Sequence, residues 1–436
     1  MTETPAHEAP PSTPPVTPPP DAPPERRPDD FALSVYRGTQ RVFSRNPLIR
    51  MALAVPRTLR FLADNLDRRL AGIEDGLPTP KLSLKLAAHV ATDEAILGLA
   101  MGPNRFPRRA DYLRVGAEMR AMRALFEKRG WLDDPRSYHR DPPELDDPTI
   151  SEHWTVTSGR LPVIRYERLL FDSGFEPRPE EVAAERWNGF TPNRTAGAWV
   201  LRHAGPPRPW LVCIHGFGMG YPVMDFGAFE AKLVHEELGY NVLLPVLPLH
   251  GHRKITPMSG EAFLSFDLVH SVHGLTQSVW DIRRLIGWAR RQGGGPIGLY
   301  GVSLGAYVAA LLSTIEPDLD RVIAGVPVSD FPGLFRGHSP THIRMRAVDH
   351  NIIGPAVEAV HRVVSPLAMP TLVPRDRRYI FAGLGDRVVR PEQAHALWQH
   401  WEQPTIAWYP GSHVGYLWAD EVTALVRRAL ARGVTA

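Results

Sequence analysis

Residues 297–314, IGLYGVSLGAYVAALLST, decide the fold. A short apolar run ends at Tyr300, the pentapeptide GVSLG follows at 301–305, and a second apolar run begins at Ala306. A G-x-S-x-G pattern between a strand and a helix places the serine on a tight turn, with its hydroxyl above the carboxyl edge of a sheet. The two glycines leave room where this turn crowds the backbone. Ser303 is therefore the candidate nucleophile, in preference to a serine merely tolerated in a turn.

Around this segment, runs of strand length alternate with runs of helical spacing. The predicted strands are 210–214, 241–247, 297–300, 321–326, 378–381 and 405–409, and the predicted helices are 226–238, 271–291, 306–314, 391–401 and 420–430. This alternation predicts an α/β fold with a mostly parallel central sheet and helices on both faces. Three earlier runs, 154–158, 162–171 and 198–203, predict leading antiparallel strands.

Two further residues complete a candidate catalytic set in the order Ser, Asp, His. Asp386 follows the predicted strand 378–381 through a glycine turn, and His413 follows the strand 405–409. Both lie at carboxyl ends of strands, the edge at which open parallel sheets gather their ligands. His413 can remove the serine proton near neutral pH, and Asp386 would fix its tautomer. Asp330, after 321–326, is the alternative acid. The non-catalytic alternatives are that Asp386 caps a loop and that His413 is a solvated loop histidine.

A glycine-rich turn after the strand 210–214 is the candidate oxyanion site. The sequence there is HGFGMG, residues 215–220. The backbone N–H of Phe217, or that of Gly216, would pair with the N–H of Leu304 to hold a developing negative charge. The following helix adds the positive end of its dipole. We expect His215 to hold the loop, and the glycine spacing disfavours a dinucleotide site.

The remaining candidates concern the pocket and metals. Met219, Tyr221 and Tyr307 are candidate substrate-binding residues that indicate an apolar acyl group, although core residues look the same at this level. No carboxylate or thiol stands near His250 and His252 to complete a metal set, so no metal and no cofactor is expected. The insert 331–377 is expected to fold as a small helical lid or as a surface loop.

These segments, with Leu249-His250-Gly251-His252-Arg253, resemble the α/β-hydrolase superfamily over residues 154–436. The resemblance implies hydrolysis of an ester, thioester or amide through an acyl-enzyme, and a serine at the elbow disfavours relatives that open epoxides or remove halide. The layout, with its N-terminal extension, is similar to mitochondrial lipid-acyl hydrolases of this fold. The expected function is a serine-dependent carboxylic ester hydrolase. An acyltransferase with the same triad and a non-catalytic lipid- or protein-binding scaffold are the alternatives.

The chain divides into three predicted parts. Ten prolines fall within the first 24 residues, so 1–30 is predicted to be a disordered tail. Residues 31–150 form a helical region and a linker (133–148), with helices over 32–70, 84–101 and 110–129, and 151–436 is the catalytic domain. Pro47 and Pro56 are expected to break or kink the first helix. Residues 37–69 contain many arginines. These could bind an anionic membrane surface, or they could face solvent while the apolar face of the helix packs on the catalytic domain.

Charge and composition narrow the partners and the compartment. The net charge of +3 gives no reason to expect a nucleic-acid partner, and a small-molecule or lipid ester is the expected one. The single cysteine, Cys213, suits a reducing compartment. No apolar run reaches the roughly 18 residues that span a bilayer. The sequence therefore predicts a cytoplasmic protein. Peripheral membrane contact through the N-terminal helices is the alternative to their packing on the catalytic domain.

Overall fold

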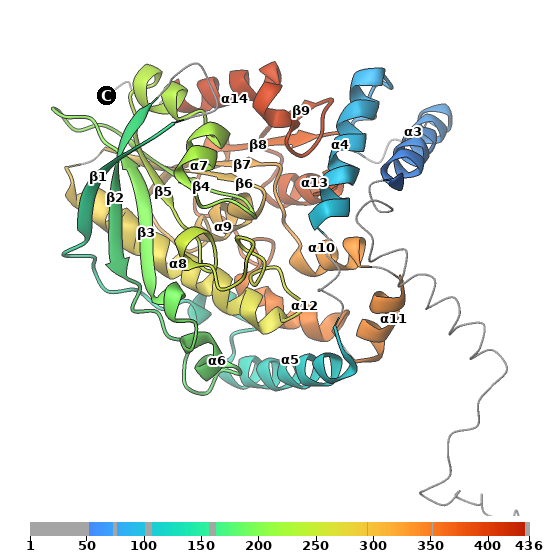
Figure 1. Cartoon of the computed structure of the whole chain (residues 1–436), viewed down its shortest axis with the longest axis horizontal. Coiled ribbons are helices and arrows are strands. Elements are labelled where there is room, and N and C mark those ends of the chain that lie inside the picture. The colour runs from blue at the N-terminus through green and yellow to red at the C-terminus, as the bar shows by residue number, and fades with distance from the viewer. Residues whose placement is uncertain are drawn as a thin grey trace, which may run out of the picture. The chain divides into compact units, whose positions relative to one another are not determined.

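A nine-stranded sheet, in the order β1-β2-β3-β5-β4-β6-β7-β8-β9, organises the structure (Figure 1). The computed structural model describes residues 52–72, 76–100, 107–156, 163–293, 295–339, 341–350 and 352–431. The strands are β1 (Thr149–Thr155), β2 (Ile164–Asp172), β3 (Thr195–Leu201), β4 (Trp210–Ile214), β5 (Asn241–Pro245), β6 (Ile297–Val302), β7 (Leu319–Gly325), β8 (Arg378–Gly383) and β9 (Thr405–Tyr409). β1, β2 and β3 are antiparallel, and β5-β4-β6-β7-β8-β9 are parallel, which confirms the predicted mostly parallel sheet.

Helices cover both faces of the sheet (Figure 1). They include α7 (Pro222–Ala228), α8 (Leu268–Arg291), α9 (Leu304–Leu312), α13 (Pro391–His400) and α14 (Asp420–Ala431). One apolar core joins α8, α9 and α13 to one face, and a second joins α7 and α14 to the other. Alternate residues of β4 divide between them, since Val212 belongs to the first core and Cys213 to the second. Cys213 is fully buried, as its position in an apolar strand predicts.

The helix predicted over 226–238 is wrong in its extent. The chain forms α7 and then a short π-helical turn, η4 (Leu233–Glu237). Pro222 at the first turn starts the helix earlier, because its missing N–H has no helical partner there. Glu230 has φ of 45°, which lies outside the right-handed helical region and separates the two pieces.

The described N-terminal helices are α3 (Ala54–Leu70), α4 (Leu84–Ala100) and α5 (Arg109–Arg129). Gly130 ends α5 in the left-handed conformation with φ of 73°, which glycine commonly adopts just after the last turn of a helix. Pro56 lies in the first turn of α3 and so starts the helix rather than breaking it. The tail 1–30, the helical segment 31–51 and Pro47 lie outside the described residues. All described residues belong to one compact unit.

The segment between α5 and β1, predicted to be a linker over 133–148, packs on the rest of the fold instead of crossing solvent. It contains the short helix η2 (Pro135–Tyr138), and the side chains of Tyr138 and Leu145 are buried. Tyr138 donates a hydrogen bond of 3.0 Å to the Glu181 carboxylate. In the described part of the chain, no helix combines the length and the apolar character that crossing a membrane requires.

The insert between β7 and β8 is helical. It contains α10 (Phe331–His338), α11 (Thr341–Asp349), α12 (Pro355–His361) and the short helices η6 (Arg362–Val364) and η7 (Arg375–Arg377). α12 packs on α5, so the insert is tied to the N-terminal helices.

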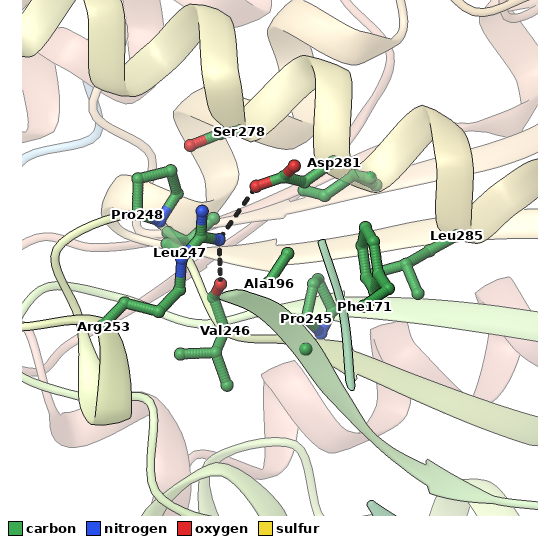
Figure 2. A pocket seen from close by; sticks show the side chains of 12 residues that line it. Phe171, Ala196, Pro245, Val246, Leu247, Pro248, Arg253, Ser278, Asp281 and Leu285 are labelled. Atoms are coloured by element: carbon green, nitrogen blue, oxygen red, sulfur yellow. Dashed lines mark hydrogen bonds and ion pairs between the residues drawn. The ribbon is translucent and has the colours of Figure 1, made fainter. Parts of the chain in front are cut away.

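A buried ion pair anchors the loop after β5. Figure 2 shows the Arg253 guanidinium between the Val246 carbonyl, at 3.0 Å, and the Asp281 carboxylate of α8, at 2.9 Å. His250 donates to the Pro248 carbonyl at 2.9 Å, and His252 donates to the Thr195 carbonyl at 3.2 Å. Both histidines therefore bond to backbone oxygens. No cluster of three or more histidine, cysteine or acidic side chains able to hold a metal occurs within the described ranges.

Candidate active site

The candidate nucleophile stands on a strained turn between β6 and α9. Ser303 has φ of 56° and ψ of −117°, a backbone conformation that a residue other than glycine adopts only where its surroundings impose it. A side chain on Gly301 would collide with the Gly305 carbonyl, and one on Gly305 would collide with the Ile214 carbonyl. Only glycine fits at either position. The turn therefore follows from close approach of three segments, and the Ser303 side chain stays partly exposed.

Asp386 and His413 lie on loops that follow two adjacent parallel strands, β8 and β9. The imidazole Nδ1 of His413 lies 2.7 Å from one carboxylate oxygen of Asp386. The other oxygen accepts hydrogen bonds from the backbone N–H groups of Val388, at 2.9 Å, and Val389, at 2.8 Å. The carboxylate is thus buried with both oxygens in use, which fixes the ring and leaves Nε2 for proton exchange.

The surroundings of His413 favour its charged form. Burial lowers the pKa of an imidazole, but the charge of Asp386, the hydrogen bond to it and the charge of Asp93 outweigh burial, and the pKa of His413 is raised above its usual 6.5. A base with a raised pKa takes a proton more readily, and it must be neutral before it can do so.

The serine turn and the acid–base pair lie at the same edge of the sheet, because β6, β8 and β9 are parallel. Within the described residues, no hydrogen bond joins the Ser303 hydroxyl to His413 or to another side chain. Such a bond commonly forms or tightens only when substrate is present.

The loop after β4 lies against the nucleophile. A Cβ placed on Gly216 would lie 3.4 Å from the Cβ of Ser303. In the part of the chain that the structure describes, the N–H groups of Phe217 and Leu304 have no protein acceptor. His215 fixes this loop, since its Nδ1 donates to the Gly216 carbonyl at 2.8 Å and its Nε2 accepts from Leu247 at 3.1 Å. The N–H groups that the sequence assigns to the oxyanion are therefore available.

The three predicted substrate-binding residues occupy different places. Met219 belongs to the loop beside Ser303, with its sulfur 3.6 Å from a Cβ placed on Gly216. Tyr221 precedes α7, and its ring lies 5.9 Å from the Lys254 ammonium. Tyr307, one turn after Ser303, lines a cavity of about 400 Å³. The other residues around that cavity come from the insert: Asp330, Phe331, Pro332, Glu358, Ala359, His361, Arg362, Ser365, Leu367 and Ala368.

The alternative acid, Asp330, has another role. Its carboxylate caps α10 by accepting the Gly333 N–H at 3.0 Å. The structure pairs His413 with Asp386 and not with Asp330.

A residue that the sequence pattern does not single out also reaches the site. Asp93 of α4 is fully buried and accepts the backbone N–H of His413 at 2.8 Å. The available signal is that Asp93 and Glu94 stand together in an otherwise apolar helix whose only other charge is Lys85.

Comparison with known proteins places the chain in a family. No family model matches it. It is 38% identical over 358 residues to two curated proteins of Mycobacterium tuberculosis, the uncharacterized protein MT2702 (strain CDC 1551 / Oshkosh) and the uncharacterized protein Rv2627c (strain ATCC 25618 / H37Rv), covering 82% of this chain and 84% of each relative. The chain belongs to their family.

The chain has an α/β-hydrolase fold, as shown by its parallel sheet, the serine turn after β6 and the Asp–His pair after β8 and β9. Among solved structures, the acetyl xylan esterase 1 from Thermoanaerobacterium sp. JW/SL YS485 aligns with a TM-score of 0.44 and 14% identity. That alignment covers 70% of this chain and 99% of the esterase.

Proposed function

We propose that the protein is a serine hydrolase that cleaves a carboxylic ester through an acyl-enzyme. Ser303 is the nucleophile, His413 the general base and Asp386 the acid that orients it. The observation that carries the proposal is the 2.7 Å pair of His413 and Asp386 at the sheet edge that also presents the strained Ser303 turn.

The proposed reaction has two steps, acylation of Ser303 and hydrolysis of the acyl-enzyme, and the same catalytic groups act in both. His413 takes the Ser303 proton as the hydroxyl oxygen attacks the acyl carbonyl, and the carbonyl oxygen becomes an oxyanion held by the N–H groups of Phe217 and Leu304. The bond to the leaving alcohol then breaks, and the imidazolium returns the proton to that alcohol. Water, deprotonated by His413, attacks the acyl-enzyme in the same way and releases the acid.

The cavity beside Tyr307 is the proposed place for the acyl group, because Tyr307 lies one turn after Ser303. Its lining combines the apolar side chains of Phe331, Leu367 and Ala368 with the charged side chains of Asp330, Glu358 and Arg362. Such a pocket orients a ligand by a few polar groups within an apolar lining.

The test is turnover of p-nitrophenyl esters from acetate to palmitate by wild type, Ser303→Ala and Ser151→Ala. Ser151 is an exposed serine of β1 and serves as the matched control. We expect wild type and Ser151→Ala to release nitrophenol equally and Ser303→Ala to release none. Equal turnover by all three variants would rule out Ser303 as the nucleophile.

An acyltransferase would use the same triad with a bound alcohol or amine in place of water. Adding glycerol during turnover separates the two activities. A hydrolase forms free acid in proportion to nitrophenol, whereas predominant acyl-glycerol would identify a transferase.

We also propose peripheral membrane contact through α3. Four apolar side chains lie on one exposed stripe of this helix: Val55, Leu59, Leu66 and Leu70. Arg69, next to the stripe, adds positive charge that attracts anionic lipid. Vesicles of phosphatidylglycerol should retain the full chain and lose it on Leu59→Ser with Leu66→Ser. Retention of the double variant would contradict this contact, and vesicle binding without any Ser303-dependent turnover would favour a non-catalytic scaffold.

A further inference from the structure

Helix α4 packs on the loops that carry Asp386 and His413 (Figure 1). Leu86 and Val90 are fully buried, and a Cβ placed on Gly385 would lie 2.7 Å from the first and 3.2 Å from the second. On the His413 loop, His89 of α4 lies 3.2 Å from the Ser412 hydroxyl. The helix therefore touches the residue before each member of the pair.

Asp93 joins the two loops directly. One oxygen of its carboxylate, Oδ2, accepts the backbone N–H of Arg387 at 3.0 Å and that of His413 at 2.8 Å. Arg387 is the residue after Asp386. A single atom of α4 thus fixes the backbone of the base and the backbone beside the acid.

A buried carboxylate is a costly way to make these two bonds. Asp93 is 0% exposed, and its second oxygen, Oδ1, has no hydrogen-bond partner among the described residues. Burial and the neighbouring charge of Asp386 raise the pKa of Asp93 to about 6, against the opposing effects of His413 and the two N–H bonds. The amide oxygen of an asparagine could accept the same two bonds without an ionised group. The charge itself therefore calls for a role.

Other charged groups around Asp93 are paired among themselves. Glu94 accepts from the side chains of Arg387, at 2.9 Å, and Arg57, at 3.3 Å. Burial and the charge of Lys85 lower the pKa of His89, which favours the neutral ring. The charge of Asp93 consequently faces Asp386 and His413.

We infer that Asp93 is a positioning residue of the proposed hydrolase. It fixes the separation of the Asp386 and His413 loops through two backbone N–H groups, and its charge helps Asp386 to stabilise the His413 imidazolium. The inference rests on the proposed function, because an imidazolium forms only if His413 acts as a base. It makes α4, which precedes the catalytic domain in the sequence, part of the catalytic machinery.

The experiment compares Asp93→Asn and Asp93→Ala with Glu94→Gln in the full chain. Glu94 is the matched control, since it is the adjacent buried acid of the same helix and does not contact His413. Each protein is titrated by NMR of ¹⁵N-labelled histidine, with His413→Gln assigning the His413 signals, and its kcat and KM are measured against pH.

We expect Asp93→Asn to lower the pKa of His413 and to move the acid limb of kcat to lower pH, because a neutral amide keeps the hydrogen bonds but not the charge. Asp93→Ala loses both and should lower kcat by about ten- to a hundred-fold with little change in KM. Glu94→Gln should leave the pKa of His413 and the acid limb in place.

An unchanged pKa of His413 in Asp93→Asn would overturn the inference, and so would an equal shift in Glu94→Gln. If Asp93→Ala does not fold, the asparagine variant decides. The NMR titration needs no turnover, so it separates the two claims. A wild type that hydrolyses nothing refutes the proposed function, while the shift in His413 still reports whether Asp93 acts on it.

Discussion

The Ser303 turn and the Asp386–His413 pair are positioned in different ways. The turn is formed by residues within a few positions of the serine, and its distant contacts are with the ends of the adjacent strands. The Gly325 carbonyl accepts the Ser303 N–H at 2.9 Å, and the Ile214 carbonyl lies against Gly305. The pair depends on Asp93, which lies 294 positions from Arg387 and 320 from His413. A turn built by local sterics leaves a short pattern in the sequence, whereas the distant residue that holds the Asp386 and His413 loops leaves almost none.

Loss of the Asp386 carboxylate should reduce activity more than any change to the residues that support the Asp386–His413 pair. Asp386→Asn should lower kcat by about 10⁴-fold, because the amide favours the wrong tautomer of His413. Steady-state ester hydrolysis measures it. Asp330→Asn, in the helix cap, should cost far less, and a greater loss there would reassign the acid.

Gly305→Ala tests the local side. The added methyl collides with the Ile214 carbonyl, which cannot move without shifting β4, so we expect unfolding to become easier by about 3–5 kcal/mol. Urea denaturation measures this, with Gly337→Ala as control, since a Cβ there meets no atom within 4 Å. A stable Gly305→Ala variant would show that close approach does not define the turn.

Asp93→Asn should make the protein more stable at pH 8 while it lowers the pKa of His413. The pKa of Asp93 is raised from 3.8 to about 6, so the fold favours the protonated carboxyl, and this stability is lost as the pH rises from about 4 through 6. A pKa rise of this size corresponds to about 3 kcal/mol. Part of the stability gained by removing the charge is lost again, because an amide oxygen accepts weaker hydrogen bonds than a carboxylate. Denaturation at pH 8 and pH 4 should show a gain of about 1–3 kcal/mol only at pH 8. A loss at pH 8 would contradict the cost assigned to this buried charge.

The smallest effect is a shift in the pH profile. His413 has a raised pKa and acts as a base only when neutral, so the acid limb of kcat/KM in wild type should lie above pH 6.5. Activity half-lost only below pH 6.5 would show that Asp386 and Asp93 do not outweigh burial.

Much of the fold could be predicted because its signals are local. Apolar runs locate the strands β4 to β9, and the glycines at 301 and 305 locate the serine turn. The helix predicted over 226–238 is wrong because apolar spacing does not reveal the backbone break at Glu230. The segment 133–148 has the polar and proline-rich composition of a linker, yet Tyr138 and Leu145 are buried by contacts with distant residues.

The candidate site follows the same division. Ser303, Asp386 and His413 could be assigned from their positions at strand ends, which share one edge of a parallel sheet. Asp93 could not, since its partners are two backbone N–H groups of loops that only the folded chain brings to α4. A buried acidic pair in an apolar helix indicates that such partners exist but not which they are.

Labelling with a fluorophosphonate, followed by mass spectrometry of the modified peptide, tests directly whether Ser303 is the nucleophile. We expect one phosphonate on Ser303 in wild type, and none in Ser303→Ala or in His413→Gln, which lacks the base. A folded wild type that stays unlabelled, or carries the phosphonate on another serine, would contradict this assignment.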